Sequence, residues 1–169
     1  MAYDLNATVI IAYYKRLDFL DKIFCGLSNQ SMKNFEVIVA EDDNSPETIE
    51  YLDRQREKRP FIIKHVSQED KGFRKNMILN EALKIATSEN ILFLDGDSVP
   101  HSEFCRMYYN NLRGGIACFG RRVMMGEKIT ASFLKDIDKP YPGFFFTYFF
   151  RCKEGRRSHL PALVPEIIQ

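Results

Sequence analysis

The segment that decides the fold spans residues 89–100 and reads Glu-Asn-Ile-Leu-Phe-Leu-Asp-Gly-Asp-Ser-Val-Pro. Its apolar run, residues 91–94, predicts a strand buried on both faces, as in a parallel sheet covered by helices. The run stops at Asp95-Gly96-Asp97. Side-chain direction repeats every second residue in an extended chain, so the two carboxylates should point the same way. Ligands of open α/β sheets bind at the carboxyl ends of strands, which makes this acid pair a candidate site.

The pair Asp95 and Asp97 suits a hard divalent cation, Mn²⁺ or Mg²⁺. Such cations are typically held by one or two carboxylates, with substrate phosphates and water completing the coordination shell. Gly96 between them permits a tight bend and lets another group approach the backbone. The same tripeptide also makes a good surface turn. The apolar run before it and the chain around it favour the site over the turn.

Strands and helices alternate on the amino-terminal side of this segment. Strands are predicted at residues 8–13, 35–40, 61–66 and 91–94, and helices at 17–28, 47–58 and 73–86. This order predicts the α/β class, with a mostly parallel central sheet, right-handed crossovers and helices on both faces. A second acidic cluster, Glu41-Asp42-Asp43, follows the second strand. The two clusters should therefore meet at one edge of the sheet.

The pattern is weaker after Pro100. A helix is predicted at residues 101–111, a strand returning to the sheet at 116–123, and a short helix at 129–135.

Length and composition further limit the class of protein. The chain has 169 residues, the length of a single domain, and 45% of them are apolar, which is enough for a sizeable core. A net charge of +1 argues against a dedicated nucleic-acid binder. The four cysteines are scattered without C-x-x-C spacing, which favours reduced core thiols over a disulfide frame or zinc site. With no leader and no membrane-spanning run, the expected location is the cytoplasm.

An aromatic stretch followed by a basic cluster lies near the carboxyl end. It consists of Phe144, Phe145, Phe146, Tyr148, Phe149 and Phe150, and then Arg151, Lys153, Arg156 and Arg157. One interpretation is peripheral contact with anionic lipid at the inner face of the membrane. The interpretation we prefer is packing in a core, or a helix that another part of the protein covers.

Four stretches, in order, resemble the family 2 glycosyltransferases, which have the GT-A fold. They are Ala12-Tyr13-Tyr14-Lys15-Arg16, Glu41-Asp42-Asp43-Asn44-Ser45, Gly72-Phe73-Arg74-Lys75 through Asn80, and Asp95-Gly96-Asp97, which is similar to the family's DXD motif. The resemblance covers roughly residues 8–123. It implies a nucleotide-diphospho-sugar donor, usually a UDP-sugar, a divalent cation, and transfer with inversion at the anomeric carbon.

The resemblance also implies a role for each matched residue. Ala12 and Tyr13 would line the nucleotide pocket through backbone and ring. Asp42 would accept a hydrogen bond from the base, Arg74 or Lys75 would contact base or phosphates, Asp95 would lie near the ribose, and Asp97, with Asp95, would bind the metal. Tyr14, Asp43 and Gly96 would also belong to the donor-binding site. Structural interpretations stay open: a strand-end aromatic pair, a turn into a helix, and a solvated basic helix face.

The general base of an inverting transferase has no recognisable motif here. We therefore expect a donor-binding domain at residues 1–125 and a partial acceptor-side segment at 126–169. Three explanations are open: the chain is a fragment, it is completed by another chain, or it is a donor-binding module that transfers nothing. A sugar-nucleotide pyrophosphorylase is disfavoured because residues 13–16 lack the glycines of a phosphate loop.

The predicted function is therefore an inverting glycosyltransferase that moves a sugar to a saccharide or lipid-linked acceptor in cell-surface glycan synthesis. The alternative is a non-catalytic or truncated nucleotide-sugar-binding module.

Overall fold

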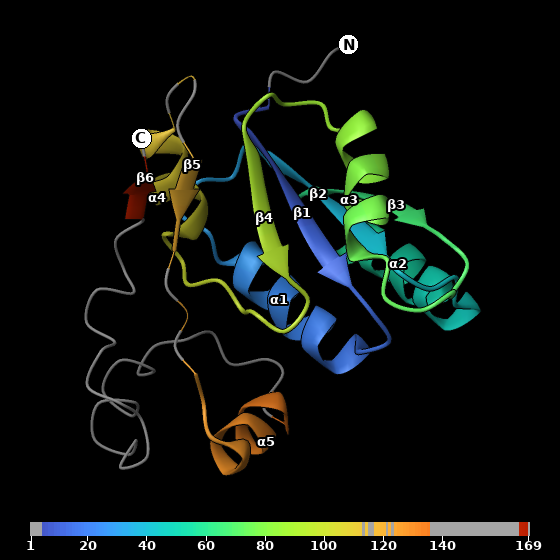
Figure 1. Cartoon of the computed structure of the whole chain (residues 1–169). Coiled ribbons are helices and arrows are strands. Elements are labelled where there is room, and N and C mark those ends of the chain that lie inside the picture. The colour runs from blue at the N-terminus through green and yellow to red at the C-terminus, as the bar shows by residue number, and fades with distance from the viewer. Residues whose placement is uncertain are drawn as a thin grey trace.

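The computed structural model describes residues 5–112, 114, 117–120, 122, 124–135 and 166–168. Its centre is a four-stranded sheet in the order β3-β2-β1-β4 (Figure 1). The strands are β1 (Ala7–Tyr13), β2 (Phe35–Glu41), β3 (Ile62–Ser67) and β4 (Ile91–Asp95), and every neighbouring pair is parallel. The predicted α/β class and the parallel sheet are confirmed.

Helices join the strands as the alternating pattern predicts. They are α1 (Leu17–Ser28), α2 (Pro46–Lys58), α3 (Lys75–Lys84), α4 (Phe104–Asn111) and α5 (Glu127–Lys135). In α1, apolar residues at helical spacing form one buried stripe, Leu20, Ile23, Phe24 and Leu27. Helix α2 begins at Pro46, whose fixed φ suits the first helical position, directly after Ser45 in extended conformation.

The sheet has a hydrophobic core on each face. One core joins side chains of β1 and β2, such as Val9 and Val37, to Phe24 of α1 and Leu52 of α2. The other core joins Ile10, Ile38 and Ala40 to Ile78 and Ala82 of α3. Helices therefore cover both faces, as the sequence predicts.

Strand β4 corrects one expectation. It was predicted to be buried on both faces, yet the side chain of Phe93 is 55% exposed. The reason is position: β4 is an edge strand, next to β1 alone in the sheet, and α3 packs mainly on β1, β2 and β3. The apolar run therefore covers one buried face, and its other face is open at Phe93.

Several predicted boundaries also differ, including an end of α3 at Lys84 rather than 86 and a start of α5 at Glu127 rather than 129. Helix α3 begins at Lys75 rather than residue 73, because Gly72 has φ +84° and Arg74 is not helical. Helix α4 begins at Phe104, not at residue 101. Within the described part of the predicted strand 116–123, the structure has β5 (Ala117–Phe119), which pairs antiparallel with β6 (Glu166–Ile168) instead of joining the central sheet.

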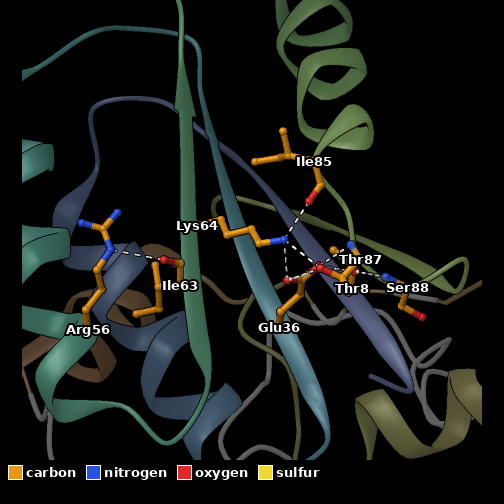
Figure 2. A network of polar contacts seen from close by, with 8 residues as sticks. All are labelled: Thr8, Glu36, Arg56, Ile63, Lys64, Ile85, Thr87 and Ser88. Atoms are coloured by element: carbon orange, nitrogen blue, oxygen red, sulfur yellow. Dashed lines mark hydrogen bonds and ion pairs between the residues drawn. The ribbon is translucent and has the colours of Figure 1, made fainter. Parts of the chain in front are cut away.

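Buried Glu36 connects several elements at the amino-terminal end of the sheet (Figure 2). Its carboxylate accepts hydrogen bonds from Thr8 Oγ1 at 2.8 Å and Thr87 N–H at 2.6 Å, and pairs with Lys64 Nζ at 2.9 Å. Burial alone would raise the pKa of Glu36, but these donors together hold it below its ordinary value. Glu36 thus joins β1, β2, β3 and the turn before β4.

The aromatic and basic stretch at 144–157 lies outside the described residues, so both interpretations of it stay predictions. The same holds for most of the predicted segment 126–169, and the boundary after residue 125 is untested. Among the described residues, no helix is both long and apolar enough to cross a membrane.

Candidate functional site

Both acidic clusters lie at the same end of the sheet, where the parallel strands finish. The strand register pairs Ala12 of β1 with Asp95 of β4, and Tyr13 with Glu41 of β2. These residues end their strands, so the segments that follow leave the sheet side by side. The expectation that the two clusters meet is confirmed.

A cavity of about 360 Å³ opens at this end of the sheet, next to α3. It is lined by Ala12, Tyr13, Tyr14, Ala40, Asp42, Gly72, Phe73, Lys75 and Ile78. Its size and its mixture of apolar walls with a few polar groups are typical of small-molecule sites. Five of the residues predicted from the sequence line it; Asp43, Arg74, Asp95, Gly96 and Asp97 lie outside this lining.

Asp42 forms one wall of the cavity and is only 7% exposed. Its Oδ1 accepts a hydrogen bond from Gln68 Nε2 at 2.5 Å, and its Oδ2 accepts one from the Arg74 backbone N–H at 2.7 Å. The Arg74 guanidinium instead donates to the carbonyl of Glu69, and its Nε is buried without a hydrogen-bond partner. Asp42 therefore holds the 68–74 loop over the cavity.

Tyr13 and Tyr14, the aromatic pair at the end of β1, lie in different environments. Tyr13 is 2% exposed and packs in the core on the α1 and α2 side, and it also belongs to the lining of the cavity. A contact between its ring and a nucleotide stays a prediction. Side chains alternate along a strand, which directs Ala12 and Tyr13 to opposite faces. Tyr14 is half exposed and lines the cavity.

Tyr14 and Lys15 are both bound to Asp70. The Tyr14 hydroxyl donates to Asp70 Oδ2 at 3.1 Å, and Lys15 Nζ donates to the same oxygen at 2.7 Å. The hydrogen bond from Lys15 is the main reason that the pKa of Asp70 lies below its ordinary value. Asp43, predicted to bind nucleotide, lies 3.7 Å from Lys15 Nζ through its Oδ2.

The Asp-Gly-Asp turn packs directly on the end of β1. A Cβ placed on Gly96 would lie 2.5 Å from the carbonyl oxygen of Ala12, so only glycine fits this contact. Asp95 binds Lys75 Nζ through Oδ1 at 2.5 Å and Arg122 Nη1 through Oδ2 at 3.0 Å. The Asp97 side chain is 67% exposed, with Arg122 Nη1 3.8 Å from its Oδ1.

The residues present fit a divalent cation that a ligand shares. No group of three or more His, Cys, Asp or Glu side chains suited to a metal occurs among the described residues. The turn instead offers the two carboxylates of Asp95 and Asp97, the number that Mg²⁺ typically takes when phosphates supply further oxygens. Asp95 and Asp97 would hold the cation, and they suit it only together with an anionic ligand in the cavity.

Sequence reasoning missed Gln68, Asp70 and Arg122. Gln68 and Asp70 follow β3 just as Asp42 follows β2, so the rule about carboxyl ends of strands could have found them. Arg122 has no such signal, because it lies beyond β5 and no periodic pattern places it beside Asp95.

The comparisons with known proteins agree on one class. The Glycosyl transferase family 2 profile matches residues 8–159. A validoxylamine A glucosyltransferase from Streptomyces hygroscopicus subsp. jinggangensis is 36% identical over 90 residues, which are 52% of this chain and 21% of that protein. A poly(ribitol-phosphate) beta-glucosyltransferase from Bacillus spizizenii is 26% identical over 111 residues, 63% of this chain and 17% of that one.

A solved structure shares the fold. The crystal structure of S. aureus TarS 1-349 matches with a TM-score of 0.50 and 24% identity, over 59% of this chain and 30% of that one. The matched part thus spans about a fifth of the length of the two curated relatives. The family profile covers most of the chain, and on that ground the chain belongs to the family 2 glycosyltransferases.

Proposed function

We propose that this chain binds a nucleotide-diphospho-sugar, with a UDP-sugar as the donor, between Asp42 and the Asp-Gly-Asp turn. The observation that carries the proposal is the cavity itself. Asp42 forms one side of it, and Lys75 links it to Asp95 at the end of β4. An elongated ligand with a base at one end and a diphosphate at the other matches this order of groups.

Asp42 suits the base end of the ligand. It is nearly buried, and its carboxylate is fixed in place by Gln68 and Arg74. A carboxylate oxygen has more than one acceptor site, so Asp42 can still accept a hydrogen bond from an imide N–H such as that of uracil. The exposed ring of Tyr14 offers an apolar surface in the same cavity.

The diphosphate end requires positive charge. Lys75 supplies one ammonium group, and α3 adds the partial positive charge of its amino terminus, where backbone N–H groups favour phosphate. A divalent cation bound by Asp97 and Asp95 would supply the charge that stabilises the departing nucleoside diphosphate.

The reaction proposed for the whole protein is an inverting sugar transfer in cell-surface glycan synthesis. An acceptor hydroxyl oxygen bonds to the anomeric carbon, the bond from that carbon to the phosphate oxygen breaks, and the diphosphate leaves with the electron pair. The acceptor, a saccharide or a lipid-linked saccharide, must lose its proton to a base that we leave unassigned. The names of the two glucosyltransferase relatives support sugar transfer.

Calorimetric titration of UDP, with and without Mn²⁺, tests the proposal in the wild type and in Asp97→Ala. We expect binding that depends on Mn²⁺ and falls at least about tenfold in the variant, because one cation ligand is lost. Asp53→Asn, an exposed position on α2, serves as the control and should bind as the wild type does. Binding that ignores both Mn²⁺ and Asp97 would contradict the proposed cation site.

Hydrolysis of a UDP-sugar in the presence of Mn²⁺ separates an enzyme from a binding module. Release of UDP from the donor by the wild type, and not by Asp97→Ala, supports a catalytic chain. Tight UDP binding without donor turnover supports the non-catalytic alternative.

A further inference from the structure

Asp95 is neutralised by two basic side chains that come from distant parts of the chain. Lys75 is the first residue of α3 and binds Oδ1, whereas Arg122 follows β5 and binds Oδ2. Arg122 also lies 3.8 Å from Asp97 Oδ1. Both carboxylate oxygens of Asp95 are therefore engaged by protein cations, and one of those cations also reaches the second acid of the turn.

A divalent cation at the Asp-Gly-Asp turn would use these same oxygens. Positive charges that share one carboxylate repel each other, and the repulsion is stronger at a protein surface than in bulk water. The Lys75, Asp95 and Arg122 side chains are each between one third and three fifths exposed. They can therefore reorient without disturbing the core.

The placement of Lys75 gives independent support. Helix α3 has a basic first residue, the preceding residue is Arg74, and no acidic residue lies in its first turn. A positive charge at a helix amino terminus opposes the helix dipole, so this sequence is unfavourable for α3 on its own. An anion beside the helix removes the conflict, and Asp95 is the anion that Lys75 contacts. Lys75 also lines the cavity, where a diphosphate could replace Asp95 as its partner.

We propose that Lys75 and Arg122 are internal counter-cations of the Asp-Gly-Asp turn, which compete with the divalent cation for Asp95 and transfer to the donor diphosphate when cation and nucleotide bind together. This inference rests on the proposed function and adds a form of regulation to it. The cation alone must displace basic side chains that then lack a partner. The nucleotide supplies that partner, so each ligand strengthens binding of the other by the same factor.

The test compares two affinities in one set of variants: that of Mn²⁺ alone, and that of UDP at saturating Mn²⁺. In Lys75→Gln we expect Mn²⁺ alone to bind about fivefold more tightly, because a competing charge is gone. We expect UDP with Mn²⁺ to bind about tenfold more weakly, because a diphosphate contact is lost. Arg122→Gln should change both affinities in the same directions. The two affinities thus change in opposite directions. If Lys75 and Arg122 only contacted the nucleotide, the affinity for Mn²⁺ alone would stay unchanged.

Lys84→Gln is the matched control, since Lys84 ends the same helix and pairs with exposed Glu81. It should change neither affinity by more than about twofold. Thermal unfolding of all variants checks that the fold is intact. The proposal is overturned if neither Lys75→Gln nor Arg122→Gln binds Mn²⁺ alone more tightly than the wild type, including the case in which no variant binds it measurably. Failure of the wild type to bind UDP with Mn²⁺ would instead contradict the proposed function.

Discussion

At the scale of single residues, the site depends on one close contact between backbones. Gly96 lies against the end of β1, where an added Cβ would meet the Ala12 carbonyl oxygen at 2.5 Å. Backbone cannot yield as the end of a flexible side chain does, so the whole turn would have to shift. That shift would carry Asp95 and Asp97 with it. Gly96 thus sets the position of both carboxylates without having a side chain of its own.

We therefore predict that Gly96→Ala weakens UDP binding in the presence of Mn²⁺ by at least about tenfold and lowers the free energy of unfolding by about 1–3 kcal/mol, the usual cost of overpacking. Calorimetry and urea unfolding measure the two effects. Gly114→Ala is the control, because a Cβ there meets nothing within 4 Å. Equal behaviour of the two variants would show that the contact with Ala12 does not position the turn.

At the scale of elements, the edge position of β4 has a measurable consequence. Ile10 of β1 and Phe93 of β4 are register partners on the same face of the sheet, yet Ile10 is fully buried and Phe93 is 55% exposed. α3 covers the first residue and leaves the second open.

Truncation to alanine should separate these two residues. Ile10→Ala should cost about 2–5 kcal/mol of unfolding free energy, as large-to-small core substitutions do. Phe93→Ala should cost less than about 1 kcal/mol, because the ring gives up little contact with the core. Urea denaturation of both variants measures the difference. Similar losses of unfolding free energy in the two variants would show that Phe93 packs against the rest of the protein more fully than its exposure indicates.

The sequence predicted most of the elements, for a physical reason. Period-2 and period-3.6 patterns report local burial, and they located α1 at both ends and β1 and β2 to within one residue. The same patterns could not distinguish a central strand from an edge strand, so the exposure of Phe93 was missed. They also gave no account of residues such as Arg122, whose partner Asp95 depends on how a distant segment folds back.

The site was predictable to a similar degree. The order of strands placed Asp42 and Asp95 at one edge of the sheet, and the structure confirms that placement. The order of strands could not show that the Tyr13 ring lies in the core. Alternation along a strand places Ala12 and Tyr13 on opposite faces of the sheet, but it does not say which face each side chain takes. The order of strands also could not show that both oxygens of Asp42 are already bound by Gln68 and Arg74, since this depends on the path of a loop.

At the scale of the whole molecule, Glu36 makes the free energy of unfolding depend on pH in the acidic range. Its pKa in the folded protein lies below the ordinary value of 4.5. The stability that it contributes is therefore fully present above the pKa of the unfolded chain and is lost as the pH falls through the lower pKa of the folded protein.

We predict that the wild-type free energy of unfolding falls between pH 6 and pH 3, and that Glu36→Gln shows a shallower fall. At pH 7, Glu36→Gln should be less stable by about 1–3 kcal/mol, because an amide cannot accept every hydrogen bond that the carboxylate accepts. Urea unfolding across this pH range provides the measurement. Exposed Glu50 on α2 offers the matched control, Glu50→Gln. A pH profile of Glu36→Gln identical to that of the wild type would contradict the assigned role.

The central proposal is a donor nucleotide bound across the carboxyl ends of β2 and β4. The most direct measurement is a crystal structure of the protein grown with UDP and MnCl₂, with anomalous diffraction at the manganese edge. We expect an anomalous peak within coordination distance of Asp97, the diphosphate between that peak and Lys75, and the uracil against Asp42. Manganese bound elsewhere, or UDP outside the cavity beside α3, would contradict it.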